Sequence, residues 1–131
     1  MIRVVLVDDQ PHVRRGLRMR LGLEPDLTVV GEAGDGEAAL QVARLVAPDV
    51  VIMDVEMPVL DGIAAAERLR AVAPRCSIVM LSLYDDAQTR ARAASAGACA
   101  FVAKTKMDEA LVDAIRAAVA LCAPVDPPPP T

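Results

Sequence analysis

Short aliphatic runs alternate along this chain with longer segments in which apolar residues recur every three or four positions. The aliphatic runs predict five strands, at residues 2–7, 27–31, 50–53, 78–81 and 100–103. The periodic segments predict five helices, over residues 10–23, 35–45, 62–72, 85–96 and 105–122. Strand and helix therefore alternate five times, and the last helix is expected to begin at a capping box formed by Thr105 and Asp108.

The expected strands are apolar throughout instead of alternating between apolar and polar residues, and such strands are buried on both faces. This pattern predicts an α/β fold, a doubly wound five-stranded parallel sheet of the flavodoxin-like (βα)5 type with three α/β/α layers. Sheets of this kind bind their ligands beyond the carboxyl ends of the strands, near the point where the strand order reverses.

Polar residues stand directly after four of these strands. Asp8 and Asp9 follow the first strand, Asp54 the third, Ser82 the fourth and Lys104 the fifth. Each residue alone has an ordinary explanation, as a helix cap, a turn residue or a solvated surface group. Because parallel strands end at the same edge of a sheet, we expect the five side chains to form one site.

Three carboxylates at one point repel one another, by about 4 kcal/mol for two unit charges 4 Å apart at an effective dielectric constant of 20. A bound divalent cation removes this repulsion, and a few carboxylates with open water positions suit Mg²⁺ better than Ca²⁺. Phosphoryl transfer uses a metal ion, a lysine, a hydroxyl donor and a carboxylate nucleophile. The strand ends therefore predict a magnesium-dependent phosphoryl site.

A resemblance to a known family rests on four stretches, D-D-Q, V-I-M-D-V-E-M-P-V-L-D-G, I-V-M-L-S and F-V-A-K. They resemble the receiver domains of bacterial two-component response regulators, and the similarity covers residues 2–121. The stretches L-S-L-Y-D-D and D-A-I-R-A-A are most similar to receivers of the NarL/FixJ type. Such proteins usually carry a C-terminal helix-turn-helix domain of the LuxR type.

By this resemblance, Asp54 accepts a phosphoryl group from a sensor histidine kinase in a magnesium-dependent reaction. The metal, Mg²⁺ with Mn²⁺ as a substitute, is held by Asp8, Asp9, Asp54 and the backbone carbonyl of Glu56. The family suggests that Asp9 binds the metal directly and that Asp8 acts mainly through water. Such a domain is not an enzyme in the usual sense, because it phosphorylates and dephosphorylates only its own aspartate.

The resemblance also implies a switch. Ser82 and Lys104 contact the phosphoryl group, and Phe101 on the fifth strand rotates into the space that Ser82 leaves. This chain has Phe101 and Ser82 where many relatives have tyrosine and threonine, and Thr105 where many have proline. Glu56 and Tyr84 occupy positions that influence autodephosphorylation in the family.

Partners follow from the same resemblance. A histidine kinase or phosphotransfer domain is expected to dock on the first helix, which carries His12, Arg14, Arg15 and Arg18, and on the loop after the fifth strand. Phosphorylation is expected to favour a homodimer through the fourth helix, fifth strand and fifth helix. The net charge of −4 argues against DNA binding by this chain, so DNA is expected to be bound only through an output domain outside it.

The length of 131 residues predicts one domain, a receiver over residues 1–122. Residues 123–131, A-P-V-D-P-P-P-P-T, are expected to be a proline-rich tail or the start of a linker. No apolar run is long enough to span a bilayer, and the first apolar run is too short for a signal peptide. We therefore expect a cytoplasmic protein without a membrane partner.

Three other readings fit the sequence less well. A haloacid-dehalogenase-type phosphatase needs a D-x-D arrangement after its first strand and a cap domain, whereas Asp8 and Asp9 are adjacent. A flavin binder of the flavodoxin type needs a phosphate loop there, and two carboxylates would repel phosphate. A receiver-like interaction module without phosphorylation would not need the full set of strand-end residues.

Overall fold

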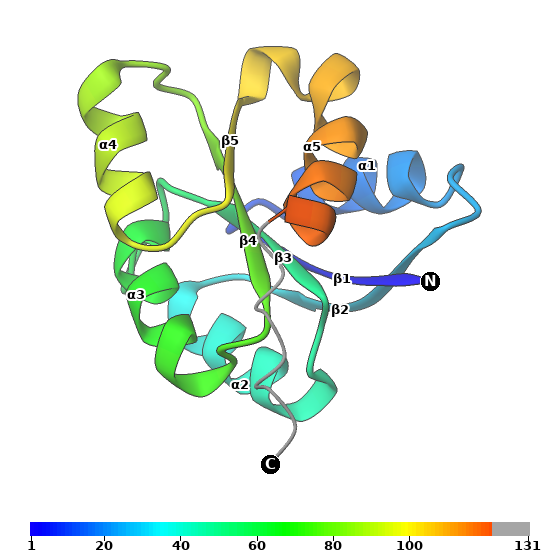
Figure 1. The fold of residues 1–131 in the computed structure, drawn as a ribbon, viewed down its shortest axis with the longest axis horizontal. Coiled ribbons are helices and arrows are strands. Elements are labelled where there is room, and N and C mark those ends of the chain that lie inside the picture. The colour runs from blue at the N-terminus through cyan, green and yellow to red at the C-terminus, as the bar shows by residue number, and fades with distance from the viewer. Residues whose placement is uncertain (122–131) are drawn as a thin grey trace, which may run out of the picture.

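Five strands and five α-helices alternate in the computed structural model, which describes residues 1–121 (Figure 1). The strands are β1 (Ile2–Val7), β2 (Leu27–Ala33), β3 (Val50–Asp54), β4 (Ser77–Ser82) and β5 (Ala100–Ala103). The helices are α1 (Pro11–Leu21), α2 (Gly36–Val46), α3 (Gly62–Val72), α4 (Ala87–Ser95) and α5 (Met107–Leu121), and a 3-10 turn, η1 (Lys104–Lys106), precedes α5. The predicted order of elements is confirmed.

All strand pairs are parallel, and the strand order is β2-β1-β3-β4-β5. The chain moves from β1 outward to β2 on one side and then returns to β3 on the other side of β1. The strand order therefore reverses between β1 and β3, and the carboxyl ends of these two strands mark the expected ligand site. The doubly wound fold predicted from the sequence is confirmed.

The sheet lies between two helix layers (Figure 1). One face packs against α2, α3 and α4 through a cluster that includes Val5, Val51 and Met53. The opposite face packs against α1 and α5 through a cluster that includes Val4 and Ile52. Successive residues of the central strands thus enter different cores, which explains why these strands are apolar throughout.

Three helices begin at an aspartate whose side chain accepts a hydrogen bond from the backbone amide three residues later, at 2.8 Å in each case. The pairs are Asp35 with Ala38, Asp61 with Ala64, and Asp86 with Thr89. Such caps satisfy amide groups that the first helical turn leaves without a partner. Asp86 is the cap of α4, so this helix begins two residues later than the sequence pattern predicted.

The capping box predicted at Thr105 and Asp108 is wrong. Thr105 lies inside η1, which leads directly into α5, so it does not occupy the cap position. The peptide bond between Lys104 and Thr105 is trans. Cys122 and the proline-rich residues 123–131 lie outside the described residues. Within residues 1–121, no helix is long and apolar enough to cross a membrane.

Candidate functional site

Three carboxylates meet where the strand order reverses. Asp8 and Asp9 follow β1 and Asp54 ends β3, and one carboxylate oxygen from each lies within 4.8 Å of the others. Asp8 and Asp54 are buried, whereas Asp9 is exposed. Oxygen ligands this close together suit a hard divalent cation, so the donor set fits the Mg²⁺ that the sequence predicted.

Lys104 holds the two buried carboxylates together. Its Nζ lies 3.1 Å from Oδ2 of Asp8 and 3.1 Å from Oδ2 of Asp54, and the lysine side chain is only 12 % exposed. Burial by itself would lower the pKa of Lys104. The hydrogen bond to Asp8 and the charge of Asp54 outweigh that effect, so the pKa of Lys104 is raised and the ammonium form is favoured.

Asp54 is the carboxylate of this group whose charged form is disfavoured. Burial, and then the negative charge of Asp8, raise its pKa from 3.8 to about 6, although Lys104 acts in the opposite direction. The single ammonium therefore does not balance two buried acids. Additional positive charge at the site would lower the pKa of Asp54 again, as a bound cation does.

Backbone amides fix both buried carboxylates. Oδ1 of Asp8 accepts a hydrogen bond from the amide of Gln10 at 2.9 Å, and Oδ1 of Asp54 accepts one from the amide of Glu56 at 3.1 Å. Arg14 also holds this loop, because its guanidinium donates to the carbonyl of Asp8 and pairs with Glu32. Both oxygens of each buried carboxylate are therefore engaged, which sets their orientation.

Ser82 lies at the end of β4, next to the site, and it is fully buried. Its hydroxyl donates to Oε2 of Glu56 at 2.8 Å, and the amide of Leu83 donates to Oε1 of Glu56 at 2.9 Å. The amide of Tyr84 in turn donates to Oγ of Ser82 at 3.0 Å. The Glu56 side chain thus connects the end of β3 to the loop after β4.

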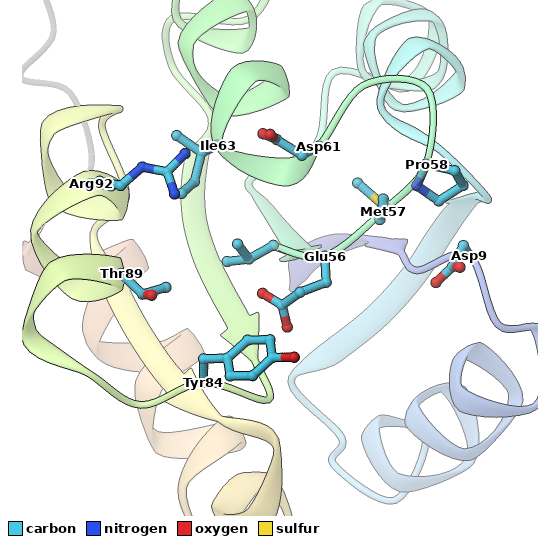
Figure 2. A pocket seen from close by; sticks show the side chains of 10 residues that line it. Asp9, Glu56, Met57, Pro58, Asp61, Ile63, Tyr84, Thr89 and Arg92 are labelled. Carbon is cyan, nitrogen blue, oxygen red and sulfur yellow. The ribbon is translucent and has the colours of Figure 1, made fainter.

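Two hollows open at this edge of the sheet. One of about 320 Å³ is lined by Asp54, Lys104, Leu83 and Glu56 together with Asp9, so the acidic group opens into it. The other, of about 530 Å³, extends toward α3 and α4 and is lined by Tyr84 and Arg92 among others (Figure 2). Glu56 lines both hollows, and Figure 2 shows its carboxylate directed toward the loop that carries Tyr84.

The loop between β3 and α3 is tightly wound. The amide of Leu60 donates to the carbonyl of Pro58 at 2.8 Å, and Val59 between them has a φ of 70°. This is the γ-turn with positive φ, which is the rarer and more strained form. At the end of the loop the amide of Gly62 donates to the carbonyl of Val55 at 2.9 Å, so the loop returns close to the end of β3.

Phe101 is half-buried on β5, and the guanidinium of Arg90 lies 4.7 Å from the centre of its ring. Arg90 also pairs with Asp85 at 2.5 Å, which places an arginine from α4 over the aromatic ring. Nothing in the sequence pattern predicts this contact. A basic residue on the helix before a strand aromatic is a weak signal, because α4 carries two arginines, Arg90 and Arg92.

All predicted site residues except Phe101 lie around the acidic group. Asp8, Asp54 and Lys104 are in direct contact, Asp9 completes the carboxylate group, and Ser82 is connected to it through Glu56. Arg14 and Arg18, which lie on the helix expected to dock a kinase, both pair with Glu32. His12 and Arg15 are exposed on α1. The structural role of Arg14 and the contact of the Glu56 carboxylate with Ser82 were not predicted from the sequence.

The comparisons with known proteins agree with this geometry. The model of the response regulator receiver domain family matches residues 4–116. The uncharacterized transcriptional regulatory protein YxjL of Bacillus subtilis is 44 % identical over 117 residues, which is 89 % of this chain and 54 % of that protein. The transcriptional regulatory protein LiaR of the same organism is 40 % identical over 119 residues, which is 90 % of this chain and 56 % of LiaR.

Solved structures show the same fold. A two-component response regulator of the LuxR family from Aurantimonas superposes with a TM-score of 0.88 at 34 % identity, covering 92 % of this chain and 86 % of that chain. The response regulator domain of Thermotoga maritima CheB gives a TM-score of 0.86 at 34 % identity, covering 97 % and 99 %. The chain spans about half the length of the curated relatives it matches.

The strand order, the acidic group between β1 and β3 and the family match over residues 4–116 all point to one assignment. The similarity to transcriptional regulators of the NarL and LuxR type, expected from the sequence, is also confirmed. This chain belongs to the response regulator receiver domain family.

Proposed function

We propose that Asp54 accepts a phosphoryl group from a phosphohistidine of a sensor histidine kinase or phosphotransfer domain. The observation that supports this role most strongly is the position of Asp54. It is a buried carboxylate, it contacts the Lys104 ammonium at 3.1 Å, and it opens into the hollow of about 320 Å³. Asp8 is equally buried but does not line that hollow, and Asp9 is exposed.

In the proposed reaction an oxygen of the Asp54 carboxylate attacks the phosphorus of the donor. A phosphorus–oxygen bond forms as the phosphorus–nitrogen bond of the phosphohistidine breaks, and the imidazole leaves with that electron pair and takes up a proton. Lys104, whose ammonium lies 3.1 Å from Oδ2 of Asp54, would neutralise charge on the transferred group. The product is an acyl phosphate on this chain, so the domain is modified and does not turn over a separate substrate.

Asp8, Asp9, Asp54 and the backbone carbonyl of Glu56 would hold the magnesium ion, or manganese in its place. When bound, the ion neutralises negative charge on the carboxylates and on the phosphoryl oxygens. Asp8 is fully buried and does not line the hollow, whereas Asp9 is exposed and lines it. This supports direct binding by Asp9, with Asp8 acting through water.

Ser82 and Phe101 are the proposed switch residues. Ser82 would move to donate to the phosphoryl group, and Phe101 would then turn into the space beside β4. Two contacts must change for this to happen, the hydrogen bond of Ser82 to Glu56 and the stacking of Arg90 on Phe101. Because Arg90 is on α4, the movement would reach the face formed by α4, β5 and α5, where we propose that the phosphorylated domain dimerises.

We further propose that the receiver comprises residues 1–122 and that residues 123–131 begin a linker to a DNA-binding output domain. Relatives that are named transcriptional regulatory proteins, and of which this chain spans about half, support this arrangement. The kinase would dock near the exposed His12 and Arg15 of α1 and the loop after β5. As a regulator of this kind, the protein is proposed to act in the cytoplasm.

The proposal is tested by incubating the protein with acetyl phosphate and Mg²⁺ and measuring its intact mass. We expect the wild type to gain one phosphoryl group and the Asp54→Ala variant to gain none. The Asp113→Ala variant, which removes an exposed carboxylate from α5, is the matched control and should gain one like the wild type. A gain in Asp54→Ala equal to that of the wild type would rule the proposal out.

A further inference from the structure

Ser82 already uses its only hydrogen-bond donor. Its buried hydroxyl accepts a hydrogen bond from the amide of Tyr84 and donates its proton to Oε2 of Glu56 at 2.8 Å. A serine hydroxyl carries one proton, so it cannot donate to Glu56 and to a phosphoryl oxygen on Asp54 at the same time. The role expected for Ser82 therefore requires that its contact with Glu56 is first broken.

The next backbone donor is occupied by the same carboxylate. The amide of Leu83 lies 2.9 Å from Oε1 of Glu56, so each oxygen of this carboxylate takes one donor from the end of β4. Leu83 and Glu56 both line the hollow into which Asp54 opens. A carboxylate held by two donors presents a pair of anionic oxygens, as a phosphoryl group would present to the same donors.

We propose that the Glu56 carboxylate is a built-in competitor of the phosphoryl group. Before phosphorylation it occupies the Ser82 hydroxyl and the Leu83 amide, and phosphorylation of Asp54 exchanges one anion for the other at these donors. This inference rests on the proposed function of Asp54. Glu56 is then a positioning residue, because it acts through Ser82 and Leu83 and sets how readily the site accepts a second anion.

Charge repulsion is the reason why the phosphoryl group would replace the Glu56 carboxylate at these donors and not join it there. A phosphoryl group on Asp54 carries up to two negative charges, and it would repel a carboxylate that remained on the same donors. The displaced side chain has space available, because Glu56 also lines the hollow of about 530 Å³ (Figure 2). Arg92 of α4 supplies positive charge to that hollow. Release of Ser82 and Leu83 would free the loop between β4 and α4.

The test compares the wild type with Glu56→Ala and Glu56→Gln, which leave the backbone carbonyl of residue 56 in place. Glu67→Ala is the control, because it removes an exposed carboxylate from α3. The first measurement is hydrogen exchange at the Leu83 amide, without metal or phosphodonor. We expect exchange about tenfold faster in Glu56→Ala, as for the loss of one charge-assisted hydrogen bond, and no change in the control.

The second measurement is the affinity for beryllofluoride in the presence of Mg²⁺, a probe that mimics a phosphoryl group on a carboxylate. We expect Glu56→Ala to bind about tenfold more tightly than the wild type. Glu56→Gln should show a smaller gain, because its single amide oxygen can serve only one of the two donors. The gain from Glu56→Ala should shrink in a Ser82→Ala background, where one contested donor is absent.

The outcomes separate the two proposals. Leu83 exchange that is the same in the wild type and in Glu56→Ala overturns the inference. Beryllofluoride binding of equal strength in these two proteins also overturns it, while leaving the phosphoryl site of Asp54 intact. A third outcome is that neither the wild type nor any variant binds beryllofluoride, while exchange at the Leu83 amide still depends on Glu56. That result overturns the proposed function of Asp54 and, with it, the proposed exchange of anions.

Discussion

A Cβ atom on Gly62 would lie 2.0 Å from the carbonyl oxygen of Asp54. The first residue of α3 therefore packs directly on the backbone of the last residue of β3, and no side chain fits between them. Their contact fixes where Asp54 stands relative to the start of α3. Glycine is required here for close approach and not for an unusual backbone angle.

Substitution Gly62→Ala should lower the free energy of unfolding by about 3 kcal/mol, because either α3 or the end of β3 must move. Urea denaturation measures this change. Gly16→Ala is the matched control, since a Cβ on Gly16 meets nothing within 4 Å and alanine favours helix. That variant should gain about 1 kcal/mol. A Gly62→Ala protein as stable as the wild type would contradict the close contact.

Val59 provides a second test of the same loop. It is 85 % exposed and has a φ of 70°, a strained angle for a β-branched residue. Val59→Gly should raise the free energy of unfolding by about 1 kcal/mol, because relief of strain outweighs the greater chain entropy of glycine in the unfolded state. Val59→Ala keeps most of the strain and should change stability little. Equal effects of the two substitutions would argue against strain at this position.

The raised pKa of Asp54 predicts that the free energy of unfolding of the metal-free protein depends on pH. Its pKa is about 6 in the folded protein, against a reference value of 3.8. Between these two pH values the folded state therefore binds more protons than the unfolded state. The free energy of unfolding consequently falls as the pH rises through this range. Without metal, Asp54→Asn should therefore be more stable than the wild type at pH 8, by on the order of 3 kcal/mol, and nearly equal to it at pH 4. Urea denaturation in the presence of a chelator at both pH values measures the difference.

Asp85 is a control for which the expected change in stability with pH has the opposite sign. The hydrogen bond from Arg90 lowers the pKa of Asp85, so its charged form stabilises the folded protein above the reference value and loses this effect as the pH falls. Asp85→Asn should therefore be less stable than the wild type at pH 8. The account of Asp54 fails if Asp54→Asn is destabilised at pH 8, or if its difference from the wild type is the same at both pH values.

Magnesium should stabilise the wild type through the acidic group. At a concentration one hundred times its dissociation constant, a ligand that binds only the folded state adds about 2.7 kcal/mol. Asp9 is the exposed member of the group, so Asp9→Asn should lose most of this response while changing the metal-free stability by less than about 0.5 kcal/mol. Thermal melting with and without Mg²⁺ measures both quantities, and Asp113→Asn should respond like the wild type. An undiminished response in Asp9→Asn would exclude it as a ligand.

The fold and the composition of the acidic site could be predicted because their signals are local. An aliphatic run that ends in an acid specifies both a buried strand and the group it delivers, as at Asp54. Element boundaries could not be predicted as closely where a residue has a role in long-range packing. The sequence pattern predicts that the second strand ends at Gly31, but β2 continues to Ala33. A Cβ on Gly31 would lie 2.7 Å from the Val42 side chain, so this glycine permits close packing of α2 on the sheet.

Contacts between side chains distant in sequence could not be predicted. Ser82 and Glu56 are 26 residues apart, and their hydrogen bond depends on the rotamer of Glu56 and on the path of the loop after β4. The stacking of Arg90 on Phe101 depends equally on how α4 packs against β5. Neither periodicity nor composition contains this information.

The most direct test of the central claim locates the modified residue. Borohydride reduces an aspartyl phosphate to homoserine, so treatment after incubation with acetyl phosphate marks the acceptor for peptide mass spectrometry. We predict homoserine at position 54, only when acetyl phosphate and Mg²⁺ are both present, and unmodified aspartate at Asp8 and Asp9. Homoserine at Asp8 or Asp9, or none at position 54, would contradict the assignment of Asp54 as the phosphoacceptor.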